Sequence, residues 1–293
     1  MTRIVPPTDD LMFKKLFSSP EYVHIIRGFL KEVLNLKVNA ADIVIKNPYS
    51  IKSYLEAQNA SDPEPSSKTV LRTTIPDVTI AIIDTANVTI EMQLVRPKYL
   101  MERIHYYIDD TFISNYNQGA TLSDNKYSTL KPVISLNILN FNLFADTRAL
   151  RTFRYRDDQT FEELNPQLKQ IGFFELSKPL SESPTISSWQ GFLKTGSANQ
   201  QATETIRNAA KIVQYQNLDP KERAVIDREQ RLIDTTEAIL AYARDEGFDD
   251  GSRQREIQIA KTALDHGISA ELVASFTQLP FEEVIQLQAT TTA

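Results

Sequence analysis

Hydrophobic and polar positions alternate along two neighbouring segments, residues 75–83 and 88–93. Both segments are rich in β-branched residues, and alternation with a period of two is typical of strands that bury one face. A short polar break at residues 84–87 separates them. The pattern therefore predicts a β-hairpin, and placing the two apolar faces together favours a register with Ile82 opposite Val88.

This register also gathers polar side chains at the open end of the hairpin. It sets Asp77 opposite Gln93 and Thr79 opposite Glu91, on the face that the apolar residues leave free. Only the apolar positions were used to choose the alignment. Because two carboxylates and an amide meet there independently of that choice, the hairpin is the expected place for chemistry.

Helical periodicity precedes the hairpin. Apolar residues recur at three- and four-residue spacing in two stretches, which predicts one helix starting near Asp9 and a second over residues 21–36. A short strand is expected over residues 42–46. The polar segment 56–67 contains prolines, and we expect an exposed loop there.

The chain after the hairpin predicts one helix and three further strands. Residues 97–117 show helical spacing, whereas residues 132–140 form a nearly continuous apolar run. Such a run is typical of a central strand that is covered on both faces. Residues 150–156 and 169–176 are the two remaining strand candidates.

The C-terminal part is rich in helical patterns. A charged helix is expected over residues 220–244, and Gly247 and Gly251 interrupt its pattern. Three helices with tight turns follow from residue 256, with Gly267 as the first stop and Ser269 as the next cap.

We therefore predict two domains, a core over residues 1–185 and a helical region over residues 186–293 that ends in a small three-helix unit. The last two predicted helices, residues 270–276 and 281–288, contain no lysine or arginine. That composition disfavours a helix-turn-helix that enters DNA, because phosphate contacts require positive charge. A packing or oligomerisation bundle is the better interpretation.

Composition excludes several classes of function. The chain of 293 residues has a formal charge of −6 and no cysteine, which argues against a surface coated in basic residues and excludes disulfides and thiolate chemistry. His24, His105 and His266 are far apart and lack the spacing of a zinc site. No long apolar run or signal-like N-terminus is present, so a soluble cytoplasmic protein is expected.

The polar residues of the hairpin carry a resemblance to a known family. Asp77 follows a proline, and after thirteen intervening residues comes Glu91-Met92-Gln93. This arrangement resembles the PD-(D/E)XK nuclease superfamily, in which a hairpin between two helices bears an acid and then D/E-x-K. The Rpn branch, recombination-promoting nucleases also described as PD-(D/E)XK nuclease family transposases, is similar over roughly the first two thirds of the chain. The other matching residues are Asp10 to Phe17, Arg103 with Tyr106 and Tyr107, Gly119, Tyr127, and Phe173 to Lys178.

The resemblance implies an α/β fold with a mixed central sheet flanked by helices, as in restriction endonucleases. It also implies a bound Mg²⁺ or Mn²⁺ ion, for which the carboxylates of Asp77 and Glu91 are suitable ligands. The backbone carbonyl of Met92 would be a third ligand. Asp10 is a further candidate, although an acid at the start of a helix more often serves as its cap.

Gln93 departs from the family pattern, which has a lysine at this position. A glutamine amide can hydrogen-bond a water molecule but carries no charge. Arg103, from the following helix, is the candidate for replacing that charge, with the alternative that it pairs with an acid of its own helix. Lys14, Tyr106 and Tyr107 are candidates for binding substrate, although exposed lysines and packed tyrosines are common without such a role.

The leading hypothesis is a metal-dependent DNA endonuclease associated with recombination or mobile DNA. The alternative is a nuclease-fold protein with weak or lost cleavage that binds DNA or another protein, for example in phage defence. Because nucleases that cut both strands often pair two active sites, a homodimer is one expected state.

Overall fold

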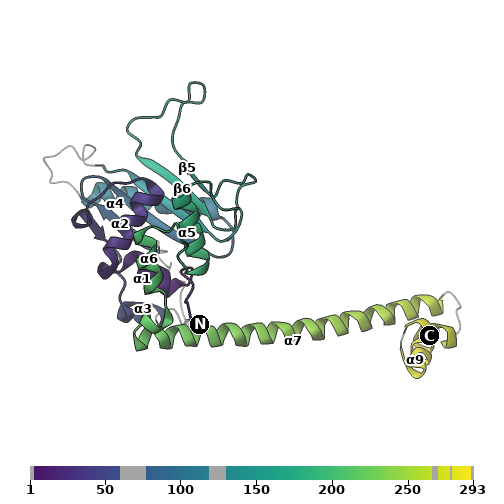
Figure 1. Cartoon of the computed structure of the whole chain (residues 1–293). Coiled ribbons are helices and arrows are strands. Elements are labelled where there is room, and N and C mark those ends of the chain that lie inside the picture. The colour runs from purple at the N-terminus through teal and green to yellow at the C-terminus, as the bar shows by residue number, and fades with distance from the viewer. Residues whose placement is uncertain (1–2, 60–76, 119–129, 266–269, 278, 292–293) are drawn as a thin grey trace. The chain divides into compact units, whose positions relative to one another are not determined.

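The computed structural model describes residues 3–59, 77–118, 130–265, 270–277 and 279–291 (Figure 1). The chain divides into two compact units, Met1–Ile226 and Asp227–Ala293. The first unit contains the sheet and the predicted hairpin, and the second contains only helices among its described residues.

A mixed sheet of six strands forms the centre of the first unit, in the order β1-β2-β3-β4-β6-β5. β3, β4 and β6 run parallel to one another, whereas β1, β2 and β5 pair antiparallel with their neighbours. The expected α/β class is thereby confirmed. The strands are β1 Ile43–Ile45, β2 Val78–Ile82, β3 Ala86–Gln93, β4 Val133–Leu139, β5 Leu150–Phe153 and β6 Lys169–Glu175.

Helices cover both faces of this sheet (Figure 1). One face packs against α1, α2, α5 and α6 in a large apolar core, in which Trp189 is fully buried with its ring 4.9 Å from that of Phe29. α4 covers part of the other face, where Ile104 packs with Phe173. The helices are α1 Asp10–Ser18, α2 Val23–Leu34, α3 Ile51–Asn59, α4 Leu100–Gln118, α5 Pro184–Thr195 and α6 Glu204–Ile212, with short 3₁₀ turns at Pro20–Tyr22, Ala40–Asp42 and Tyr215–Asn217.

Several sequence predictions are confirmed in this unit. The first helix is capped by Asp9, whose carboxylate accepts the backbone N–H of Met12 at 3.1 Å. The strands predicted over residues 42–46 and 132–140 are present as β1 and β4, and every residue of β4 is buried, as expected for a central strand. Two helices beyond the predicted domain boundary at residue 185, α5 and α6, pack within this first unit against α2.

The hairpin register differs from the predicted one by two residues. Ile80, rather than Ile82, lies opposite Val88. A shift of two keeps both apolar faces together, so the hydrophobic pattern fits either register equally well. The predicted alignment of Asp77 with Gln93 is therefore wrong.

The turn decides the register. Residues 83–85 form a three-residue turn in which Asp84 adopts a left-handed conformation with φ of 54°. Aspartate tolerates this conformation better than most residues. The tighter turn brings Thr79 opposite Thr89 rather than opposite Glu91.

One helix and one strand of this unit depart from the sequence predictions. α3 includes residues 56–59, which were expected in a loop, because Ser50 bonds the first turn and Tyr54 is buried beneath it; residues 60–67 lie outside the described part. β5 ends at Phe153, short of the predicted Arg156.

The second unit contains most of α7 (Pro220–Asp265), together with α8 (Ala270–Thr277) and α9 (Phe281–Thr291). α7 continues through Gly247 and Gly251, where an interruption was expected. An isolated glycine costs a helix only about 1 kcal/mol, which the surrounding helix-forming residues outweigh. Gly267 and Ser269 lie outside the described residues. The end of α7 packs with α8 and α9 around a small apolar cluster of Ala260, Leu264, Ala270, Val273, Leu279 and Val284.

Within the described ranges, no helix combines the length and the apolar character needed to cross a lipid bilayer.

Candidate active site

The corrected register places the two hairpin carboxylates directly across from each other. Val78 pairs with Ile90, so the next position sets Asp77 opposite Glu91. The backbone N–H of Asp77 donates to Glu91 Oε1 at 3.1 Å, and the N–H of Met92 donates to Asp77 Oδ2 at 3.0 Å. Each strand therefore holds the carboxylate of the other, and both acids are fixed at one end of the hairpin.

Burial makes the ionised form of this pair unfavourable. The Glu91 side chain lies in a residue only 6% exposed, and burial together with the charge of Asp77 raises the pKa of Glu91 to about 7. Burial also raises the pKa of Asp77, and the nearby carboxylate of Asp10 adds to that effect. The positive charges of Lys14 and Arg103 oppose the increase for Asp77. The pair is therefore short of positive charge, as expected where a cation would bind.

Asn47 fixes the start of β2 and was not identified from the sequence. Its Nδ2 donates to the backbone carbonyl of Asp77 at 3.0 Å, and its Oδ1 accepts the N–H of Thr79 at 2.8 Å. One side-chain amide thus satisfies both backbone groups that flank Val78 on this edge. The Asn47-Pro48 dipeptide signals a turn, but nothing in the sequence indicates that its amide reaches a residue thirty positions later.

Gln93 lies beside the carboxylate pair rather than opposite Asp77. Its Nε2 donates to Glu91 Oε2 at 3.2 Å. This hydrogen bond opposes part of the rise in the pKa of Glu91 that burial and Asp77 cause. With Asp77 N–H on Oε1 and Gln93 on Oε2, both oxygens of Glu91 are oriented. Asp77 Oδ1 accepts no hydrogen bond from any residue that the structure describes.

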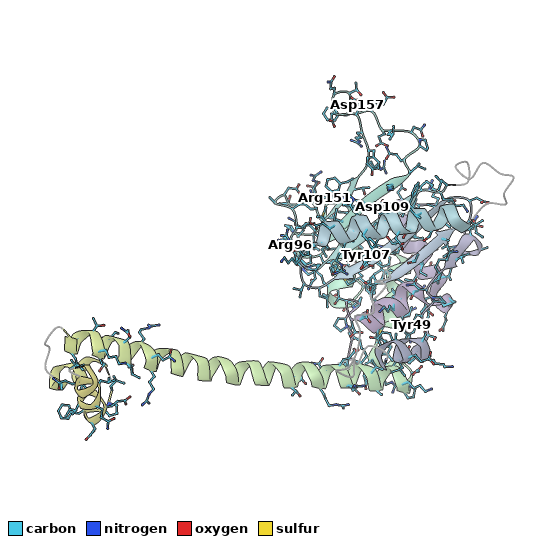
Figure 2. The ribbon with its side chains drawn as sticks, turned by 180° about the vertical axis from the view of Figure 1, so that it is seen from behind. Tyr49, Arg96, Tyr107, Asp109, Arg151 and Asp157 are labelled. Carbon is cyan, nitrogen blue, oxygen red and sulfur yellow. The ribbon has the colours of Figure 1, made fainter. Side chains whose placement is uncertain are left out.

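Arg103 reaches the site from α4. Its guanidinium donates to the hydroxyl of Tyr107 at 3.1 Å, instead of pairing with Glu102 or Asp110, and its charge lowers the pKa of both Asp77 and Glu91. Tyr107, labelled in Figure 2, is buried, so it holds the arginine in place. Tyr106 is 58% exposed, and its ring and that of Tyr107 form a T-shaped pair.

A cavity of about 300 Å³ opens next to Asp77. Lys14 of α1, Asn47 and Tyr54 of α3 line it together with Asp77. The Nζ of Lys14 bonds Asp10 at 2.9 Å and lies 5.5 Å from the centre of the Tyr54 ring. Since Asp9 caps α1, the alternative that Asp10 is the cap is wrong. α3, which the sequence analysis missed, supplies one wall of this cavity.

The carboxylates of Asp77 and Glu91 suit a magnesium ion that keeps several of its water ligands. No group of three or more histidine and acidic side chains is arranged to hold a metal in the described ranges. Mg²⁺ is commonly bound through only one or two carboxylates, with water and substrate phosphate completing its coordination. Asp77 and Glu91, two desolvated carboxyls without a full complement of positive charge, fit that requirement.

A family model for PD-(D/E)XK nuclease family transposases matches residues 7–243. The chain belongs to this family. No curated protein and no solved structure matched the chain. The PD-(D/E)XK match extends from α1 past α4 and so includes every candidate site residue, and it makes the chain a nuclease-fold protein linked to mobile DNA. Of the residues that carried the resemblance, Pro76, Gly119 and Tyr127 lie outside the described part.

Proposed function

We propose that the protein is a divalent-metal-dependent endonuclease that hydrolyses phosphodiester bonds of DNA during recombination or transposition. The observation that carries this proposal is the pair of buried carboxyls, Asp77 and Glu91, that the hairpin clamps together through reciprocal hydrogen bonds. Membership of the PD-(D/E)XK family supports DNA as the substrate.

In this proposal Asp77, Glu91 and the backbone carbonyl of Met92 hold Mg²⁺ or Mn²⁺. When bound, the ion lowers the pKa of a coordinated water and neutralises charge on the scissile phosphate. Asp10 serves at most as an outer ligand, because its carboxylate is half exposed and already bonded to Lys14.

The other site residues orient Glu91 and the attacking water, and supply positive charge. Gln93 holds Glu91 Oε2, and its amide oxygen is available to accept a hydrogen bond from the attacking water. Arg103, positioned by Tyr107, supplies the positive charge that lysine provides elsewhere in the superfamily. In this proposal Lys14 and Tyr106 contact the DNA backbone, which is supported by the position of Lys14 at the cavity and by the exposure of Tyr106.

Gln93 also favours a second candidate function. An amide cannot supply the charge of a lysine, and the whole chain carries a formal charge of −6. A nuclease-fold protein that binds DNA or a partner protein with little cleavage is consistent with both facts.

A plasmid-nicking assay tests the proposal. We expect the purified full-length protein to nick supercoiled DNA with Mg²⁺ or Mn²⁺ and not with EDTA, and Asp77→Asn to lower the rate by at least about 100-fold through loss of a metal ligand. Asp84→Asn is the matched control, because Asp84 lies in the turn of the same hairpin with a side chain 91% exposed. Equal nicking by Asp77→Asn and the control would refute the site, and DNA binding without nicking by the wild type would favour the second candidate.

Asn47→Ala tests the positioning of the ligand. We expect the substitution to weaken metal binding about 10-fold, because Asp77 and Thr79 lose the amide that fixes the start of β2. Titration of Mn²⁺ into the protein, followed by calorimetry, measures the affinity. Asn39→Ala is the control, since the Asn39 side chain is exposed and its hydrogen bond goes to Asp42. An unchanged affinity in Asn47→Ala would show that the hairpin holds Asp77 without help.

A further inference from the structure

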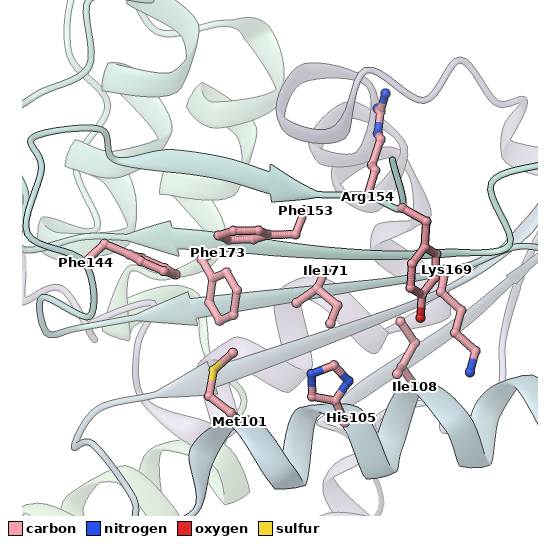
Figure 3. A pocket seen from close by; sticks show the side chains of 10 residues that line it. Met101, His105, Ile108, Phe144, Phe153, Arg154, Lys169, Ile171 and Phe173 are labelled. Atoms are coloured by element: carbon pink, nitrogen blue, oxygen red, sulfur yellow. The ribbon is translucent and has the colours of Figure 1, made fainter. Parts of the chain in front are cut away.

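A second cavity, of about 340 Å³, lies away from the carboxylate pair, on the side of the sheet that α4 covers only in part (Figure 3). Its walls are mainly apolar, with Met101 from α4, Ile171 from β6, and three phenylalanines. The ring of Phe144 stacks on that of Phe153 at 5.6 Å, and Phe173 meets both edge-on. Three basic side chains, His105, Arg154 and Lys169, also line the cavity.

The connection between β5 and β6, residues 154–168, forms an arm that projects from the sheet (Figure 1). An isolated bridge between Arg156 and Glu163 joins its two sides. At the tip, Asp157 (labelled in Figure 2) accepts the backbone N–H groups of Gln159 and Thr160. These bonds give the tip a defined turn.

The tip exposes a large aromatic side chain. Phe161 is 71% exposed, and its φ of 58° lies in the left-handed region, which is unfavourable for a bulky residue. The hydrogen bond from its N–H to the carbonyl of Asp157 holds this conformation at 3.1 Å. Leu164 is exposed beside it. The arm therefore presents apolar side chains on a shaped turn without covering them.

Charge at the tip is opposite to charge at the cavity. Residues 157–164 contain four acids and no lysine or arginine, whereas, among the described residues, three basic residues and no acid line the cavity. Glu163 pairs with Arg154 and Arg156 within the arm. The carboxylates of Asp158 and Glu162 form no ion pair with a described residue, and so remain available to a basic partner.

We propose that the arm tip of one copy of this chain inserts Phe161 into the aromatic cavity of a second copy, and that the second copy returns the same contact. The cavity lies at the base of the arm, since Phe153, Arg154 and Tyr155 line it. Two arms that lie antiparallel about a two-fold axis therefore place each tip at the base of the other. A single self-complementary interface of this kind closes as a dimer and fills the aromatic cavity of each copy.

A second copy fits this cavity better than a nucleotide. A nucleobase site needs polar groups that converge on the base edges, whereas this cavity is lined chiefly by hydrocarbon. The pairs that Arg154 and Lys169 make with Glu163 and Asp109 are partly exposed to solvent, so both cations can exchange these partners for the acids of an inserted tip. A phenylalanine flanked by acids satisfies both the apolar walls and the basic lining.

Cross-linking tests the contact directly, because the natural chain has no cysteine. Phe161→Cys and Met101→Cys are made as two separate full-length variants, one with a longer tag, and are mixed and oxidised. We expect a disulfide-linked heterodimer on a non-reducing gel in the mixture, at several times the level of either homodimer from a single variant. Leu180→Cys mixed with Met101→Cys is the control, because Leu180 is exposed but lies outside the arm. No preference for the Phe161→Cys mixture over this control would overturn the proposal.

Solution mass, measured by light scattering over a concentration series, provides the second test. We expect the wild type to dimerise and Phe161→Ala to raise the dimer dissociation constant about 100-fold, because each dimer loses two buried aromatic side chains. Leu180→Ala should match the wild type, and circular dichroism should show an unchanged fold in both variants. A wild-type monomer throughout the series would overturn the proposal. So would a dimer unaffected by Phe161→Ala, or binding of free nucleotides that Phe153→Ala abolishes.

Discussion

Glu91→Gln is expected to abolish metal-dependent cleavage and, at the same time, to make the metal-free protein more stable at pH 8. The carboxylate is a proposed metal ligand, so its loss should lower the nicking rate by at least about 1,000-fold. The same carboxylate is buried beside Asp77, and its charge is unfavourable until a cation neutralises it. Function and stability therefore make opposite demands on Glu91.

The pH dependence of stability follows from the raised pKa of Glu91. Folding shifts this pKa from 4.5 to about 7. The neutral carboxyl contributes its full stabilisation below pH 4.5, and that contribution is lost as the pH rises through 7. At pH 8 the ionised side chain lowers the free energy of unfolding by about 3 kcal/mol, which glutamine would restore. Asp77 N–H can still donate to the new amide oxygen, and Gln93 can rotate its amide to accept.

Urea unfolding at pH 5 and pH 8, in EDTA and in Mg²⁺, measures this effect. Glu91→Gln should exceed the wild type at pH 8 in EDTA and differ less at pH 5, and Mg²⁺ should stabilise only the wild type. Glu56→Gln is the control, because Glu56 is an exposed acid outside the site. Cleavage by the wild type should increase as the pH rises through 7, since metal binding requires the ionised carboxylate. A variant less stable than the wild type at pH 8 would contradict the assignment.

Glu222→Ala is expected to lower the free energy of unfolding by about 3–5 kcal/mol, because it removes one partner of a buried ion pair. Glu222 Oε2 accepts from Lys15 of α1 at 2.5 Å, and Oε1 accepts from the hydroxyl of Tyr49 at 2.9 Å. The backbone N–H of Asp219 donates to the same carboxylate at 3.0 Å. Alanine would leave the Lys15 ammonium buried without a counter-charge.

Two comparisons separate this buried pair from ordinary surface charge. The double variant Lys15→Met/Glu222→Leu should recover much of the lost stability, because neither charge is then left unpaired. Glu56→Ala removes a pair with Lys52 that is 3.9 Å long and exposed, and should cost less than about 0.5 kcal/mol. Chemical unfolding of the full-length chain measures all three. A similar loss in Glu222→Ala and Glu56→Ala would contradict the role of the buried pair.

The hydrophobic periodicity of the sequence predicted which helices and strands form better than it predicted where they begin and end. The apolar run at residues 132–140 and the alternation in the hairpin correspond to β4, β2 and β3, because side chains that face a core must follow the geometry of their own element. α3 was missed, since its stability comes from the Ser50 bonds and from the burial of Tyr54. Its sequence beyond residue 55 is polar.

In the candidate site, the local sequence pattern predicted some features, and contacts between distant segments decided the others. The sequence indicated that Asp77 and Glu91 share one face of a hairpin, and the structure places both at its open end. Asn47 could not be found in this way, because its contact with Asp77 depends on how β1 and its following turn pack beside β2. The roles in metal binding and catalysis stay predictions for the experiments above.

By itself, the sequence determined that the chain forms an α/β nuclease-like core in which two carboxylates share the polar face of one hairpin. Only the tertiary structure decided that Asp77 lies opposite Glu91 rather than Gln93. The physical reason is that a two-residue shift leaves the apolar pattern unchanged, whereas the left-handed turn at Asp84 permits only one of the two registers. Burial against the rest of the core then set the charge of the pair, which no local pattern encodes.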